Sequence, residues 1–189
     1  MRKSTKWWLA GASAGTAAAL WAAYGLTVRP LHLRWGATDE ELVASMPFDT
    51  LIPEANFFAT RAITIKAKPE DIWPFATDTA LLPRGTIIRH AEPNRVVVFA
   101  PPEVEAESTW VVTLEPRTDG TTRLVSRNRA RFGRSLAAIW RYLIVDPGQF
   151  VIERNWMLQI RDRSEELAAS VAGAIEAPRN IEAEDPVPV

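Results

Sequence analysis

The side chain best placed for chemistry is a carboxylate on the apolar side of a predicted helix. At 100° per residue, Glu153 projects within the same sector as Phe150 and Ile160. A carboxylate that faces an apolar interior needs a partner or has a shifted pKa, so Glu153 is a candidate for ligand contact or general acid–base catalysis. The alternative is that Glu153, in the first two turns of its helix, interacts with the positive end of the helix dipole and pairs with an arginine at the rim. We prefer this second interpretation.

Two polar residues interrupt a strand face that otherwise carries apolar side chains. Ser126 and Asn128 alternate with Leu124 along one strand, and Trp110 lies on the corresponding face of the preceding strand. These polar residues either line a ligand pocket or form hydrogen bonds near the end of the strand, at the edge of the sheet. With residues of the helix, they make up the predicted ligand contacts, which are Trp110, Ser126, Asn128, Glu153 and Met157.

Three arginines at two-residue spacing occupy the opposite face of the same strand. Arg127, Arg129 and Arg131 could contact anionic lipid headgroups, since each charge near such a surface contributes about 1 kcal/mol. The alternative, which we prefer, is a solvated outer face of the sheet whose charge is balanced by Glu115 or a similar residue.

Composition disfavours several other kinds of site. The chain has no cysteine, and its two histidines, His32 and His90, have no second ligand at a spacing that suits a metal. The glycines of the N-terminal segment do not form a phosphate-binding loop. We therefore assign no metal, no cofactor and no catalytic residue. A formal net charge of −1 also disfavours nucleic acid as a partner.

The first 28 residues have the pattern of a membrane anchor. Residues 1–6 are basic, and residues 7–28 form an uncharged run longer than the ~20 residues that cross a bilayer. Aromatic residues suited to the membrane interface bracket this run, namely Trp7, Trp8, Trp21 and Tyr24. We predict a single-pass transmembrane helix in contact with bilayer lipid, and a cleaved signal peptide is the alternative. The basic residues before the run give a slight preference for an extracytoplasmic domain.

The rest of the chain divides into a linker, one domain and a tail. Residues 29–56 are predicted as a juxtamembrane linker with a short helix, which Thr38 and Glu41 open as a capping box. Residues 57–173 are predicted as the domain, and the acidic, proline-bearing residues 174–189 as a disordered tail.

Within the predicted domain, strands come before a long terminal helix. A β-branched strand over 57–67 leads into a helix that begins at Pro69, and two hairpins follow, over 84–102 and 107–132. Helices are predicted over 134–145 and 146–175. This order predicts an α+β fold in which an antiparallel sheet wraps its apolar face on the long terminal helix.

This order of elements, and several stretches of sequence, resemble the START/polyketide-cyclase-like superfamily (SRPBCC), which has the helix-grip fold, and in particular its membrane-anchored bacterial members. The stretches that carry the resemblance are "LHLRWGATDEEL", "ATRAITIKAKPEDIWPF", "STWVVTLEP…GTTRLVSRNRAR" and "IWRYLIVDPGQFVIERNWMLQIRDRSEE". The resemblance implies a cavity between the sheet and the terminal helix. This chain departs from the family after Phe75, where it passes almost directly to Leu81, so part of the cavity wall is expected to be missing.

Three functions are compatible with these observations. The first is a membrane-anchored helix-grip domain that binds a small hydrophobic or lipid-like ligand between the sheet and the terminal helix. The second is a structural or interaction module at the membrane that has no pocket. The third, ranked last, is an enzyme of the cyclase or dehydratase type with Glu153 as general acid–base.

Overall fold

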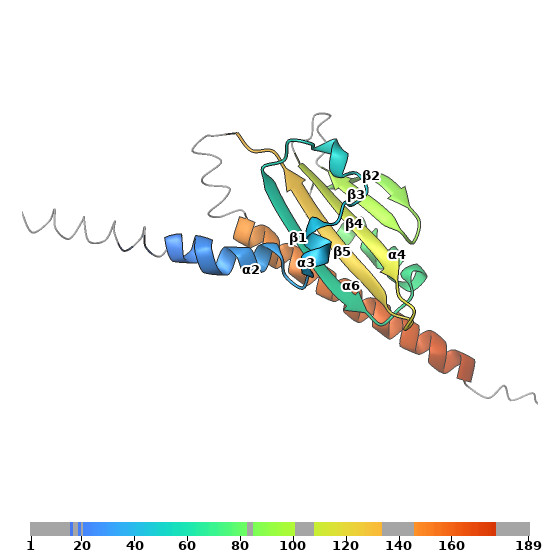
Figure 1. Ribbon diagram of the computed structural model, residues 1–189. Coiled ribbons are helices and arrows are strands. Elements are labelled where there is room, and N and C mark those ends of the chain that lie inside the picture. The colour runs from blue at the N-terminus through green and yellow to red at the C-terminus, as the bar shows by residue number, and fades with distance from the viewer. Residues whose placement is uncertain are drawn as a thin grey trace, which may run out of the picture.

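One antiparallel sheet packs on a long C-terminal helix, α6 (Asp146–Glu176), in the computed structural model of the chain (Figure 1). The structure describes residues 16, 19, 21–82, 85–100, 108–133 and 146–176. This arrangement confirms the predicted α+β class with a sheet on a terminal helix.

The sheet has five strands, β1 (Phe57–Ile65), β2 (Ile87–Glu92), β3 (Val96–Ala100), β4 (Ser108–Pro116) and β5 (Thr122–Ala130). Their order across the sheet is β1-β5-β4-β3-β2, and every neighbouring pair is antiparallel. Both predicted hairpins are observed, and Asn94 (φ 61°) and Gly120 (φ 82°) supply the left-handed backbone of their turns. The first strand pairs with the last, so residues far apart in sequence share each face of the sheet.

The inner face of the sheet packs against α6. Trp156, Met157 and Ile160 recur at three- and four-residue spacing, and all three are buried. They meet Phe99 and Trp110 from the central strands in one apolar cluster, which we call the inner core. Asp146, the predicted start of this helix, is the first described residue of α6, and proline follows it.

A short helix, α4 (Pro69–Ala76), connects β1 to the second half of the sheet and packs on α6. Proline is tolerated at its first position, whereas Pro74 inside the helix removes a backbone donor, and the helix ends within a few residues. The chain then turns through η3 (Thr79–Leu81) into Leu82. Ile72, Ala76 and Leu82 are all buried in the inner core, so the shortened region still covers one end of it.

The outer face of the sheet is covered by residues 37–54, which we call the strap. The strap contains α3 (Asp39–Val43), which lies over the sheet in Figure 1, and η2 (Asp49–Leu51). Its Met46 packs with outer-face valines of the sheet. The predicted capping box is confirmed, because Thr38 and Glu41 exchange backbone-to-side-chain hydrogen bonds of 2.8 and 3.2 Å.

A glycine places the strap against the sheet. Gly36 has a φ of 70°, and a Cβ atom at this position would collide with the backbone oxygen of Ala62 in β1. The amide of Ala62 also donates to the carbonyl of Trp35 (3.0 Å). Only a residue without a side chain allows the two backbones to approach so closely.

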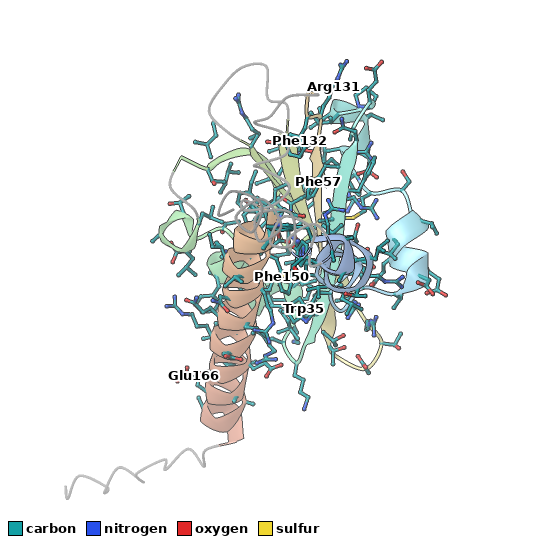
Figure 2. The ribbon with its side chains drawn as sticks, turned by 90° about the vertical axis from the view of Figure 1, so that its left-hand side faces the viewer. Trp35, Phe57, Arg131, Phe132, Phe150 and Glu166 are labelled. Carbon is teal, nitrogen blue, oxygen red and sulfur yellow. The ribbon has the colours of Figure 1, made fainter. Side chains whose placement is uncertain are left out.

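The segment before the strap, which the sequence divided between the end of the predicted transmembrane helix (to residue 28) and the linker (from residue 29), is helical and docks on the domain. η1 (Tyr24–Val28) continues directly into α2 (Arg29–Leu33). Arg29 Nε donates to Asp146 Oδ2 at the start of α6 (3.1 Å). Nearby, Phe150 of α6 lies beside Trp35, with ring centroids 6.2 Å apart (Figure 2).

Within the described residues, no helix is both long and apolar enough to cross a bilayer. Most of the predicted span, with Trp7 and Trp8, lies outside those residues. Trp21 is 41% exposed and packs edge-on against Tyr24, whose hydroxyl bonds His32. The helix predicted over 134–145 also lies outside the described residues, whereas residues 174–176 of the predicted tail belong to the end of α6.

Candidate functional site

The carboxylate of Glu153 lies in the interior of the domain, between α6 and the sheet. Its side chain is only 1% exposed, as is that of Arg61, its partner from β1. The preferred interpretation of the sequence, an ion pair at the rim, is therefore wrong about the location, although the arginine partner is present. The difference arises because α6 packs on the inner face of the sheet with Glu153 directed at β1 and β5.

Both oxygen atoms of Glu153 accept hydrogen bonds. Oε2 accepts from Arg61 Nη1 (2.5 Å) and from Asn128 Nδ2 (2.7 Å). Oε1 accepts from Ser126 Oγ (2.6 Å), and this hydroxyl in turn accepts from Trp110 Nε1 (2.7 Å). We call these five residues the inner network. Such charge-assisted hydrogen bonds are shorter and stronger than neutral ones.

Strand register explains why these side chains meet. Arg61 of β1 is the pairing partner of Ser126 in β5, and Trp110 of β4 is the partner of Asn128. Alternation along each strand directs all four side chains to the inner face, over the second turn of α6. The structure thus brings together four of the five predicted ligand contacts, while the fifth, Met157, is fully buried in the inner core.

Arg61 is the functional residue that the sequence did not single out. It alternates with apolar residues of β1, and a charged residue on an otherwise apolar strand face is a signal for a buried partner. Besides Glu153, it contacts the N-terminal segment, because its Nε donates to the carbonyl oxygen of His32 (2.9 Å). Its guanidinium also lies 5.3 Å from the ring centroid of Phe150.

The electrostatics of the inner network are set by burial. Loss of solvent raises the pKa of Glu153 above that of an ordinary glutamate, while Arg61, Ser126 and Asn128 act in the opposite direction. Oε2 accepts two hydrogen bonds and Oε1 accepts one, so Oε1 keeps one acceptor site for a further donor.

Two buried donors beside the network have no acceptor among the described residues. They are Arg61 Nη2 and Trp156 Nε1. The ring of Trp156 packs 4.8 Å from that of Trp110, and the ring of Phe99 lies at the same distance from Trp110. A buried N–H without an acceptor costs about 1–3 kcal/mol, so native interiors seldom contain one without a water or a ligand.

Arg127 of the outer face is buried and Arg129 is largely so, contrary to the prediction, whereas Arg131 is exposed as predicted and pairs with Glu54. Arg127 is buried under the strap, where it donates to Thr60 Oγ1, to the carbonyls of Ala44 and Glu41, and to Asp49 Oδ2, at 2.6–3.0 Å. Its charge is therefore balanced by Asp49 rather than by Glu115. The prediction failed because the sequence did not indicate that the supposed linker crosses this face.

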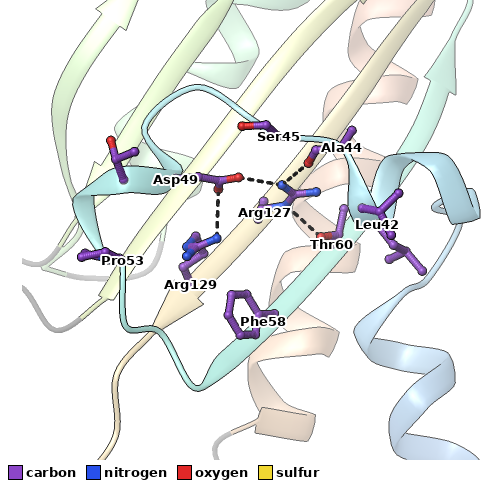
Figure 3. Close-up of a pocket in the computed structure, with 11 residues that line it drawn as sticks. Leu42, Ala44, Ser45, Asp49, Pro53, Phe58, Thr60, Arg127 and Arg129 are labelled. Carbon is purple, nitrogen blue, oxygen red and sulfur yellow. Dashed lines mark hydrogen bonds and ion pairs between the residues drawn. The ribbon is translucent and has the colours of Figure 1, made fainter.

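A pocket of about 470 Å³ lies between the strap and strands β1 and β5 (Figure 3). Its lining includes Leu42 and Pro53 of the strap, Phe58 of β1, and Arg127 and Arg129 of β5. This volume falls within the range of about 300–1,000 Å³ that is usual for small-molecule sites.

The histidines take part in other contacts. His32 is buried and bonds the hydroxyl of Tyr24 through Nε2 (2.8 Å), and burial lowers its pKa. His90 is exposed beside Glu92, 3.3 Å away. Across the ranges that the structure describes, no group of three or more histidine, cysteine or acidic residues is arranged to hold a metal ion.

Comparisons with known proteins give matches to solved structures alone. No protein-family model matches the chain, and no curated protein matches it. The Aha1 dimer from Colwellia psychrerythraea has a TM-score of 0.44 and 14% identity, with 58% of this chain and 96% of that chain covered. CalC from Micromonospora echinospora, described as a self-sacrificing resistance protein, has a TM-score of 0.40 and 14% identity, with 59% and 96% covered.

A third neighbour is the polyketide-cyclase-like protein Cgl2372 from Corynebacterium glutamicum, with a TM-score of 0.33 and 13% identity. The match covers 65% of this chain and 96% of that chain. The structural neighbours thus include Aha1, CalC and polyketide-cyclase-like proteins. Similarity at this level does not identify a function, so the candidate site rests on the contacts of this chain alone.

Proposed function

We propose that the chain is a ligand-binding helix-grip domain that takes a small, largely apolar molecule between the sheet and α6. The observation that carries this proposal is the pair of buried donors without acceptors, Arg61 Nη2 and Trp156 Nε1, beside a layer of aromatic rings. A ligand with one acceptor oxygen on an apolar body would satisfy a donor while its body packs on those rings. The ligand class is therefore a hydroxyl- or carbonyl-bearing hydrophobic molecule.

The inner network gives the site its polarity. Trp110, Ser126 and Asn128 hold the carboxyl group of Glu153 in one position. The burial that raises the pKa of Glu153 also penalises a charged ligand, so neutral ligands are favoured. Met157 supplies apolar surface behind the network. A hydrogen bond lost to a neutral group changes affinity by about 0.5–1.5 kcal/mol, or roughly tenfold at most.

The test uses the full chain in phosphatidylcholine nanodiscs, with its tryptophan indole nitrogens labelled for NMR. Three neutral probes are titrated separately, namely 2-naphthol, 1-decanol and 1-decanoylglycerol. We expect at least one probe to shift the Trp156 indole resonance saturably, and Trp156→Phe to weaken binding of that probe several-fold. The matched control is Trp73→Phe on α4, which also packs against the inner core and should leave the affinity unchanged.

The proposal fails if none of the three probes gives a saturable shift at Trp156. It fails equally if Trp156→Phe and Trp73→Phe weaken binding to the same extent, since the missing acceptor would then have no bearing on affinity.

We further propose that residues 7–28 hold the domain at a membrane as a single-pass helix, with the domain on the extracytoplasmic side. The support is the uncharged run itself and its aromatic ends at Trp7, Trp8, Trp21 and Tyr24. Replacing Ala14 and Ala18 together by arginine adds about 2.5–3.5 kcal/mol per charge to the cost of insertion. We expect this double variant to leave the membrane fraction on carbonate washing, while the wild-type chain stays in it.

A second candidate function, an interaction module without an internal ligand, is favoured by the packing of the inner core. Phe99, Trp110 and Trp156 pack ring on ring in the space between sheet and helix. This function predicts that none of the three probes alters hydrogen–deuterium exchange in β5 or α6. Protection of these two elements by any probe contradicts it.

A further inference from the structure

The pocket between the strap and the sheet is separate from the inner network, because it lies on the opposite face of the sheet. Thr60 and Arg127 point outward into it, whereas Arg61 and Ser126, their neighbours in the same strands, point inward. A molecule held in this outer pocket would therefore not touch the inner core (Figure 3).

The two arginines of the pocket differ in how fully they are bonded. Arg127 uses all three of its nitrogens in hydrogen bonds to the strap and to Thr60. Arg129 donates from Nη2 to the carbonyl of Ile52 (3.0 Å), but its buried Nε has no acceptor within the described residues. Its Nη1 lies 3.6 Å from Asp49 Oδ1, which is beyond hydrogen-bond distance. Arg129 thus has hydrogen-bond donors at the pocket that are not used within the described residues.

The remaining lining combines positive charge with apolar surface. Two arginines and one aspartate leave an excess of one positive charge. Phe58 is 49% exposed and lies 4.8 Å under the guanidinium of Arg129, and Val43 is 84% exposed at the strap side. Exposed apolar side chains next to a charged group with free donors suit a ligand that has an anionic head and an apolar body.

From this geometry we infer a second ligand site that binds a small amphipathic carboxylate, with its carboxylate on Arg129 and its apolar part between Phe58, Leu42 and Val43. The planar guanidinium matches a carboxylate in shape and charge, and its Nη1, 3.6 Å from Asp49 Oδ1, makes no hydrogen bond to that carboxylate. A pocket of about 470 Å³ accommodates a ligand with a single aromatic ring and a short chain.

The experiment uses the full chain with 13C-labelled leucine and valine methyl groups, in phosphatidylcholine nanodiscs, and titrates it with 4-phenylbutyrate. We expect a saturable shift of the Leu42 and Val43 methyl signals and a weaker response to the uncharged analogue 4-phenylbutan-1-ol. Arg129→Gln removes the charged donor and should weaken phenylbutyrate binding by about tenfold or more. Equal affinity for acid and alcohol overturns the inference, as does the absence of a saturable shift.

The control is Arg131→Gln, two residues further along the chain and just after the end of β5, where the arginine is exposed and pairs with Glu54 (3.0 Å). This variant should bind phenylbutyrate like the wild type. If Arg131→Gln weakens phenylbutyrate binding as much as Arg129→Gln does, the loss comes from the change in overall charge, and the proposed site at Arg129 is wrong.

Because Arg129→Gln could loosen the strap, a second variant tests the pocket without touching its ion pairs. Val43→Trp replaces an exposed residue and fills part of the volume, so it should block phenylbutyrate while the unfolding transition stays unchanged. Unaltered binding to this variant contradicts the inference. Trp156→Phe, in the inner core, should not change phenylbutyrate affinity, which separates this site from the proposed function.

Discussion

The two faces of the sheet both bury arginines, but they neutralise them in different ways. On the inner face, Arg61 meets a single carboxylate, Glu153, carried by a 31-residue helix, and both side chains are 1% exposed. On the outer face, Arg127 meets one carboxylate and two backbone carbonyls of the irregular strap. The inner guanidinium therefore has one carboxylate and one backbone carbonyl, that of His32, as acceptors, whereas the outer one has a carboxylate, two carbonyls and a hydroxyl.

This difference has a consequence for stability and for ligand access. When the only carboxylate partner of a buried guanidinium is removed, a dry interior offers no other counter-ion. Arg127 lines the pocket beside the strap, so water in the pocket can reach its partners when the arginine is replaced (Figure 3). We therefore expect replacement of a charged residue to lower the free energy of unfolding more on the inner face than on the outer face.

The largest expected effect is that of Glu153→Met, which leaves Arg61 charged and unpaired in the interior. An uncompensated buried charge of this kind lowers the free energy of unfolding by about 3–5 kcal/mol. Urea unfolding of the full chain, followed by tryptophan fluorescence, measures it. Arg61→Met should lower the free energy of unfolding less, because the unpaired carboxyl group of Glu153 can take up a proton.

The control for this prediction is the double variant Arg61→Met with Glu153→Met. Replacing both ions by apolar side chains of similar length should restore most of the lost stability, because no charge remains buried. A double variant no more stable than Glu153→Met would show that packing, and not charge, explains the loss.

The intermediate effect is that of Arg127→Met on the outer face. Four hydrogen bonds are lost, but their acceptors in the strap regain contact with water, so we expect the free energy of unfolding to fall by about 2 kcal/mol. The matched control is Arg131→Met, an exposed position just after the end of β5, where the change should stay within about 0.5 kcal/mol. If Arg127→Met costs more than Glu153→Met, the ranking of the two faces is wrong.

Much of the fold could be predicted because its signals are local. The hairpin turns depend on neighbouring residues such as Asp119 and Gly120, and the start of α3 depends on Thr38 and Glu41, three residues apart. The period of apolar residues was sufficient to find the strands and the long helix. The predicted contacts Ser126 and Asn128 followed from the same alternation, since polar residues on an apolar strand face need partners.

The features that were missed depend on contacts between distant residues. Arg61 and Glu153 are 92 positions apart, and their pairing requires both the strand register and the rotation of α6 about its axis. The strap was predicted as a linker because it follows the predicted transmembrane run, and its own sequence does not show that it crosses the outer face of the sheet. It is held instead by arginines of β5 about 80 positions further along the chain, such as Arg123, which bonds Glu41.

The smallest expected effect is a difference in pH dependence between the two faces. On the outer face, the hydrogen bond from Arg123 lowers the pKa of Glu41. A carboxyl group with a lowered pKa in the folded state adds stability above its unfolded pKa, here about 4.5. That contribution is lost as the pH falls from 4.5 through the folded pKa.

On the inner face the sign is opposite, because burial raises the pKa of Glu153. A carboxyl group with a raised pKa in the folded state contributes stability that is fully present below the unfolded value of 4.5 and is lost as the pH rises through the folded pKa. The two glutamates should therefore give opposite slopes of unfolding free energy against pH.

The measurement compares the wild type with Glu41→Gln and with Glu153→Gln, by urea unfolding at several values of pH between 3 and 7. Glutamine keeps the shape of each side chain and does not titrate, so the difference from the wild type isolates each group. We expect the stability advantage of the wild type over Glu41→Gln to shrink toward low pH, and that over Glu153→Gln to shrink toward high pH. Slopes of the same sign would mean that the pair with Arg61 outweighs burial, and that the two faces hold their carboxylates in the same way.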